Sequence, residues 1–91
     1  MITFSDITKD MTELYERKNK DYGNSFDKTL NEFGIVAGLI RLNDKMNRIK
    51  SIYNKDVSVK DESLEDTLID LANYAVMTLM WINNKNELRS I

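Results

Sequence analysis

The sequence predicts an all-α protein, a small bundle of three long helices and one short helix, forming a single domain over residues 1–91. Apolar residues recur at helical spacing in several stretches, no segment alternates with period two for long, and no proline occurs anywhere. A chain of 91 residues is close to the size at which a single core is only marginally stable. We therefore expect a second copy to complete the core, giving a homo-oligomer.

The longest nearly apolar stretch, from Leu64 to Ile82, predicts the central helix of the bundle. Its first apolar stripe consists of Leu64, Leu68, Leu71, Ala75, Leu79 and Ile82. A second stripe on a neighbouring face consists of Ile69, Ala72, Val76 and Met80. A helix that is apolar over most of its circumference belongs in the interior of a bundle. We expect Ser63 to cap its start, with Asp66 three residues on, and the polar tail from about residue 83 to fray.

The other helices are bounded by caps and breaks. Ser5 is the expected N-cap of a first helix that ends near Asp21, before Gly23. A short helix is expected over 26–33, ended by Gly34 as a left-handed cap. The next helix is expected over 35–53, with cations on one side and apolar residues on the other. The apolar face comprises Ile35, Val36, Leu39, Leu42, Met46, Ile49 and Tyr53. The polar residues 54–61 predict a loop.

The composition weighs against several classes of function. A formal net charge of −2 and a pI near 5.1 argue against general nucleic-acid binding. Without cysteine or histidine, the usual zinc sites are excluded, and any metal would be held by carboxylates, which favour Mg²⁺ or Mn²⁺. The N-terminus shows no secretion signal, and Asp66 and Asp70 weigh against a membrane span in the last helix. We expect a soluble, cytoplasmic protein that binds no membrane.

The segment KNKDYGNSF at residues 18–26 mixes cations, amides, a hydroxyl and two aromatic rings around a glycine. Such a group suits a base stacked on a ring and phosphates that meet lysine. The candidate contacts are Lys18, Asp21, Tyr22, Ser25 and Phe26. The alternative is a helix end with solvated charges and two core aromatics.

A stripe of cations follows on the helix expected over 35–53. Arg41, Lys45 and Arg48 are spaced i, i+4, i+7, so they could together hold a di- or triphosphate. The alternative is a solvated face on which Asp44 pairs with Arg48.

A ladder of carboxylates, Glu62, Asp66 and Asp70, leads into the last helix and could hold a divalent ion. The alternative for the first two is favourable charge near a helix N-terminus. Asp70 has apolar neighbours in the sequence, so we expect it to be partly buried with a defined partner. We favour a cation from Arg41, Lys45 or Arg48 as that partner.

Three motifs occur in order: KNKDYGNSF at 18–26, RLNDKMNRI at 41–49 and DESLEDTLIDLANYA at 61–75. Together they resemble the nucleotide-modification-associated domain family of phages and their bacterial hosts, which is grouped with the MazG-like all-α nucleoside triphosphate pyrophosphatases. The resemblance covers about residues 11–81 and implies a MazG-like fold with a magnesium-associated nucleotide site, completed by oligomerisation. MazG-like enzymes carry E-x-x-E on the second core helix and E-x-x-D on the third.

This sequence departs from both of these motifs. The second core helix offers only Asp44 among cations. Asp70 stands for the final aspartate of the third helix, but Thr67 lies three residues before it and Asp66 is one place out of register. The leading hypothesis is therefore a homo-oligomer that binds, and sequesters without cleavage, a nucleotide signal or modified nucleotide, as a phage sponge would. The alternatives are a Mg²⁺-dependent (d)NTP pyrophosphohydrolase, with Asp66 and Asp70 at the metal, and a helical protein-interaction domain.

Overall fold

Four helices make up the fold: α1 (Phe4–Tyr22), α2 (Ser25–Phe33), α3 (Ile35–Ile52) and α4 (Leu64–Ser90). The computed structural model describes residues 1–22, 24–54 and 63–90, and the side chains of residues 21, 22 and 87–90 lie outside that description. No strand occurs within these residues, and three helices are long and one short, which confirms the predicted fold class. The predicted loop lies outside the described residues except for Asn54.

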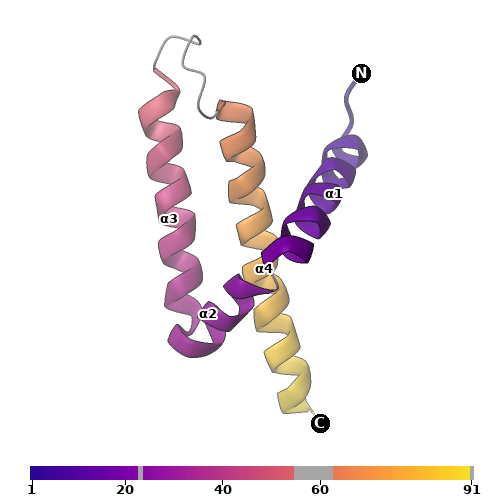
Figure 1. Ribbon diagram of the computed structural model, residues 1–91, viewed down its shortest axis with the longest axis vertical. Helices are drawn as coiled ribbons and strands as arrows, with labels where there is room; N and C mark the ends of the chain where they lie inside the picture. Colours follow the sequence, from indigo (N-terminus) through magenta and orange to yellow (C-terminus); the bar gives the residue numbers. More distant parts are fainter. Residues whose placement is uncertain (23, 55–62, 91) are drawn as a thin grey trace.

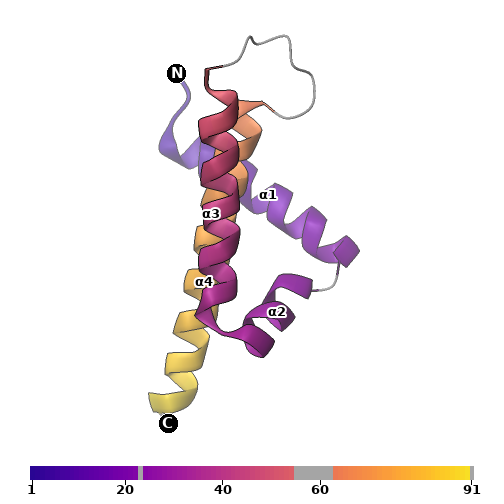
Figure 2. The same ribbon diagram turned by 90° about the vertical axis from the view of Figure 1, so that its left-hand side faces the viewer.

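The two long helices α3 and α4 run antiparallel and side by side, and α1 crosses α4 at an angle (Figure 1). In the view turned by 90°, the short α2 lies between the end of α1 and the start of α3 (Figure 2). The molecule is elongated, with principal extents of 51 × 29 × 23 Å. Its Cα radius of gyration is 14.9 Å, whereas a compact chain of this length would have about 12 Å.

Side chains cap the starts of α1 and α4. The Asp6 backbone N–H donates to Thr3 Oγ1 at 3.1 Å, and the Thr3 N–H donates to the Asp6 carboxylate at 2.9 Å. The N-cap of α1 is therefore Thr3, and the prediction of Ser5 is wrong. A reciprocal pair of this kind needs an acidic residue three positions after the cap, and Asp6 stands at that distance from Thr3. The backbone bond from Thr3 lowers the pKa of the Asp6 carboxyl below its ordinary value. At α4 the Asp66 N–H donates to Ser63 Oγ at 3.0 Å, which confirms the predicted cap.

Gly34 separates α2 from α3 and donates its N–H to the Leu30 carbonyl at 2.8 Å. Its φ of 80° is positive, as expected, but its ψ of −169° is extended rather than left-handed helical. This region is accessible to glycine almost alone. The extended ψ turns the chain directly from α2 into α3.

Small and polar residues occupy the contact between α3 and α4. A Cβ atom on Gly38 would lie 2.8 Å from Thr78 Oγ1, so the absence of a side chain there lets the two helices approach closely. Thr67, Asp70 and Thr78 are the buried polar residues of α4. The two threonine hydroxyls donate to carbonyls one turn earlier, those of Ser63 and Tyr74, at 3.0 and 2.7 Å. Their burial therefore leaves no hydroxyl unpaired.

The first apolar stripe of α4 consequently lies mostly at the surface of the single chain. Leu64, Leu68, Ala75 and Leu79 are exposed, and Leu79 has 55% of its surface accessible. The chain has an accessible surface of 7276 Å². A compact monomer of 10.6 kDa would expose about 5,500 Å². The other helices of the chain therefore leave most of this apolar stripe uncovered.

The predicted apolar face of α3 is also partly wrong. Ile35, Val36, Leu39, Met46 and Tyr53 are exposed. Leu42 and Ile49 of the predicted face are only partly exposed, as are Ala37, Lys45 and Ile52, and Gly38 is buried. The close contact at Gly38 sets the rotation of α3 about its axis, so Lys45 lies among the packed residues rather than on the opposite side.

Helix α4 continues beyond residue 82, where the sequence predicted fraying, and ends at Ser90. The Trp81 indole N–H donates to Asn31 Oδ1 at 2.8 Å, and Lys85 Nζ lies 5.0 Å from the Trp81 ring centroid. The bond to Asn31 joins this part of α4 to α2. Over the described residues, no helix has the length and apolar character needed to cross a membrane.

Candidate functional site

The site is built around Asp70, which lies in the middle of α4 and is 8% exposed. Its two carboxylate oxygens each accept from a lysine: Oδ1 from Lys18 Nζ of α1 and Oδ2 from Lys45 Nζ of α3, both at 3.3 Å. The expected partner from α3 is thus confirmed as Lys45. The second partner, Lys18, comes from a motif that the sequence did not connect with Asp70. One carboxylate joins three helices.

Tyr74 lies one turn after Asp70 and brings aromatic and cationic groups together. The Arg41 guanidinium carbon lies 5.5 Å from the centroid of the Tyr74 ring, and Lys45 Nζ lies 5.8 Å from it. The Phe26 ring of α2 meets the Tyr74 ring edge-on, with centroids 5.0 Å apart and planes at 73°. Attraction between a cation and the face of an aromatic ring supports this placement of Arg41. Three cations therefore lie around a single carboxylate and a tyrosine.

A cavity of about 260 Å³, which we call the lysine cavity because Lys18 lines it, opens beside this cluster. Lys18, Ser25, Phe26, Asp70 and Tyr74 are among its lining residues. Asn73 also lines it and donates through Nδ2 to the Met11 carbonyl at 3.4 Å, which holds α1 against α4. The wall thus combines positive charge, a hydroxyl and aromatic surface, as a site for an anionic ligand with a ring would require.

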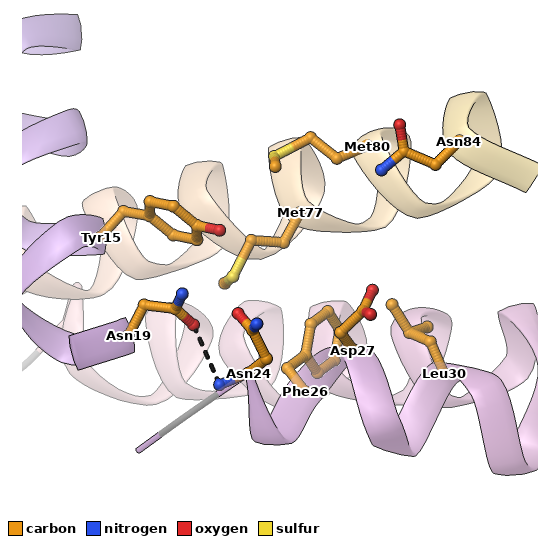
Figure 3. A pocket seen from close by; sticks show the side chains of 9 residues that line it. All are labelled: Tyr15, Asn19, Asn24, Phe26, Asp27, Leu30, Met77, Met80 and Asn84. Carbon is orange, nitrogen blue, oxygen red and sulfur yellow. Dashed lines mark hydrogen bonds between the residues drawn. The ribbon is translucent and has the colours of Figure 1, made fainter. Parts of the chain in front are cut away.

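A second cavity of about 200 Å³, the amide cavity, adjoins the first and is shown in Figure 3. The two share Tyr15, Asn19, Phe26 and Met77 in their walls. The amide cavity also has Asn24, Asp27 and Asn84 in its wall, so it is rich in polar side chains that carry no positive charge. In Figure 3 the Asn19 side chain is joined to the Asn24 backbone N–H, which donates to Asn19 Oδ1 at 3.2 Å.

The structure brings together most of the residues that the sequence singled out. These are Lys18, Ser25, Phe26, Arg41, Lys45 and Asp70, which all belong to the cluster or to the lysine cavity. Arg48 is exposed on α3, one turn beyond Lys45. The side chains of Asp21 and Tyr22 lie outside the described residues.

Sequence reasoning did not single out Tyr15, Asn19 or Tyr74 individually. Tyr74 could have been found from its i+4 spacing after Asp70, because that spacing places both on one face of α4. Tyr15 and Asn19 are likewise spaced i, i+4 on α1. Nothing in the sequence shows that this face of α1 meets α2 and α4 at a cavity.

The described residues do not fit a magnesium ion at Asp70. Both carboxylate oxygens already accept from ammonium groups, which would repel a divalent cation. Asp66 is exposed, and no group of three acidic residues that could hold a metal occurs among residues 1–22, 24–54 and 63–90. Glu62, the first member of the predicted carboxylate ladder, lies outside the described residues. A ligand here would meet positive charge supplied by the protein itself.

The chain matches a known protein family. The model of a family described as nucleotide modification associated domain 1 matches residues 18–82, which begin at Lys18 and include Arg41, Lys45, Asp70 and Tyr74. No curated protein and no solved structure matches the chain.

Proposed function

This chain belongs to the nucleotide modification associated domain 1 family, and we propose that it binds a phosphorylated nucleotide and holds it without cleavage. The observation that carries the proposal is a cluster of three cations beside a cavity with aromatic walls. In this cluster Lys18 and Lys45 contact the Asp70 carboxylate, and Arg41 lies over the Tyr74 ring. The excess of positive charge is local, because the whole chain has a formal net charge of −2. An anionic ligand is attracted to such a cluster.

Each residue has a distinct part in this proposal. Arg41 can bind two phosphate oxygens at once through its planar guanidinium, whereas the lysines act as point charges. Asp70 holds Lys18 at the cavity wall and Lys45 beside it before the ligand arrives, which reduces the ordering needed on binding. Phe26 and Tyr74 supply ring surface for the sugar or the base. Ser25, another residue of the wall, supplies a hydroxyl that can bond a phosphate or a sugar.

The charges at the site support binding without cleavage. Metal-dependent hydrolysis of a nucleoside triphosphate requires carboxylates that are free to hold metal ions near the phosphates. Asp70 is engaged with two lysines, and Asp66 is exposed one turn away. Compared with the nucleotide site of MazG-like enzymes, this chain would keep the phosphate-binding part and lack the metal-binding part. The phosphate-binding part alone is enough to sequester a nucleotide signal or a modified nucleotide in the cytoplasm.

The proposal includes a homo-oligomer. The exposed part of the first apolar stripe, with Leu64, Leu68, Ala75 and Leu79, runs along α4 as a continuous i, i+4 or i, i+7 series. A contiguous apolar surface of this kind is a typical protein-interaction site. A second copy placed with its own stripe against the first would bury both, as a twofold interface does.

The direct test is a binding assay with nucleoside mono-, di- and triphosphates, cyclic dinucleotides and inorganic triphosphate, each with and without Mg²⁺. We expect binding that does not depend on Mg²⁺ and that falls with increasing salt. Chromatography of the mixtures should recover the nucleotides intact. Mg²⁺-dependent release of pyrophosphate would instead establish the pyrophosphohydrolase, and the absence of binding by every phosphate compound would contradict both.

Arg41→Ala tests the phosphate assignment. Loss of a charged hydrogen bond should weaken binding of inorganic triphosphate by about 1.5–3 kcal/mol, which is roughly 10- to 150-fold in Kd. Lys50→Ala is the matched control, because Lys50 is an exposed cation on the same helix and does not line either cavity. Equal losses in the two variants would show general charge attraction rather than a site at Arg41.

A further inference from the structure

We infer that the amide cavity of Figure 3 recognises a guanine base, and that Asp27 is the residue that selects it. This inference rests on the proposed function, because it takes the phosphates to lie in the adjoining lysine cavity. It extends that function from nucleotides in general to guanine nucleotides.

The amide cavity presents polar groups that the protein does not use itself. Asn24 occupies the N-cap position of α2, where an asparagine side chain ordinarily bonds a backbone N–H, but it makes no such capping bond. Figure 3 shows its side chain directed instead into the space between α2 and α4. Asn24 also has a positive φ of 61°, which is uncommon outside glycine.

Asn19 lies beside Asn24 in the wall of the cavity and is held in a fixed orientation. Its Oδ1 accepts the Asn24 backbone N–H, so its Nδ2 is left as a donor for a ligand. Asp27 and Asn84 face the same space from α2 and α4 in Figure 3. Asp27 is exposed and makes no hydrogen bond or ion pair within the described part of the chain. The wall thus offers amide donors and one free carboxylate.

This combination matches the hydrogen-bonding edge of guanine. Guanine carries two adjacent donors, N1–H and the 2-amino group, beside the acceptor O6. A carboxylate can accept from both donors at once, while an amide N–H donates to O6. Adenine offers only one donor group on that edge, and hypoxanthine, the base of inosine, lacks the 2-amino group. Asp27 therefore has a bidentate partner only in guanine.

The size and the walls of the cavity suit a base. A volume of about 200 Å³ is below the roughly 300–1,000 Å³ of a site for a whole drug-sized ligand. Phe26 and Met77 provide apolar surface for the faces of a planar ring. Both residues also line the lysine cavity, so a ligand that lies across the shared wall can reach Lys18.

The test compares GTP, ITP and ATP, which have the same triphosphate and differ in the base, by calorimetry without Mg²⁺. We expect the parent protein to bind GTP at least tenfold more tightly than ITP or ATP, because a bonded polar group discriminates strongly against an analogue that lacks it. In Asp27→Asn the preference for GTP over ITP should fall to within about threefold. Glu32→Gln, which removes an exposed carboxylate from the same helix outside the cavities, should keep it.

The outcomes separate this inference from the proposed function. Equal binding of GTP, ITP and ATP by the parent would overturn guanine recognition and leave nucleotide binding in place. A GTP preference that persists in Asp27→Asn would overturn the role of Asp27. If neither the nucleotides nor inorganic triphosphate binds, the proposed function fails and the inference fails with it.

Discussion

Replacing Asp70 by asparagine separates the two roles that this residue could have. The change keeps the size of the side chain and removes one negative charge from between Lys18 and Lys45. The Asp70 side chain is 11% exposed, that of Lys45 20% and that of Lys18 54%. The loss of stability is therefore unequal at the two lysines, because the Lys18 ammonium group can be solvated by water more easily than that of Lys45.

The magnitude follows from those exposures. Breaking a fully buried ion pair costs about 3–5 kcal/mol, whereas a solvent-exposed pair contributes only about 0–1 kcal/mol. The pair with Lys45 lies near the first case and the pair with Lys18 near the second, and the asparagine oxygen still accepts one hydrogen bond. We expect a loss of about 2–3 kcal/mol in the free energy of unfolding. For a domain of this size that lowers Tm by roughly 10–20 °C.

Thermal and urea unfolding with and without Mg²⁺ measure the effect. Asp66→Asn is the matched control, since Asp66 is exposed one turn earlier on α4, and it should cost less than about 1 kcal/mol. Mg²⁺ should not raise the Tm of the parent, and Asp70→Asn should still bind inorganic triphosphate because all three cations remain. An unchanged Tm for Asp70→Asn, together with loss of a Mg²⁺-induced rise seen in the parent, would refute the ion-pair role and place a metal at Asp70.

Three further predictions concern the fold and the assembly. Gly38→Ala should destabilise the protein in urea by about 1–2 kcal/mol, because the new Cβ meets Thr78 and this overpacking outweighs the gain in helix propensity; adding Thr78→Ala should recover part of the loss, and no recovery would contradict the close contact. Leu68→Glu should shift the protein to a monomer in light scattering at micromolar concentration, and a parent that is already monomeric would exclude the dimer. Trp81→Phe should cost about 0.5–1.5 kcal/mol through the lost bond to Asn31, and an unchanged urea midpoint would show that this bond does not stabilise the fold.

The sequence determined the helices and the main candidates for the site. Helical periodicity, the missing prolines and Gly34 sufficed for four helices, because these are local signals read over a few turns. The burial of Asp70 and its pairing with a cation of α3 also followed from sequence, because a charge among apolar neighbours requires a partner. The cap at Thr3 was missed because Ser5 offers the same kind of side chain two residues later.

Only the tertiary structure decided which faces meet. The α3–α4 contact is set by a glycine opposite a threonine, so it buries small and polar residues and leaves apolar ones outside. Periodicity marks an apolar stripe but not the partner that covers it, and here the helices of the same chain do not cover it. The connection from Lys18 to Asp70 spans 52 residues, and the amide cavity joins α1, α2 and α4. Such groupings depend on the angle and rotation at which helices pack, which no local pattern in the chain specifies.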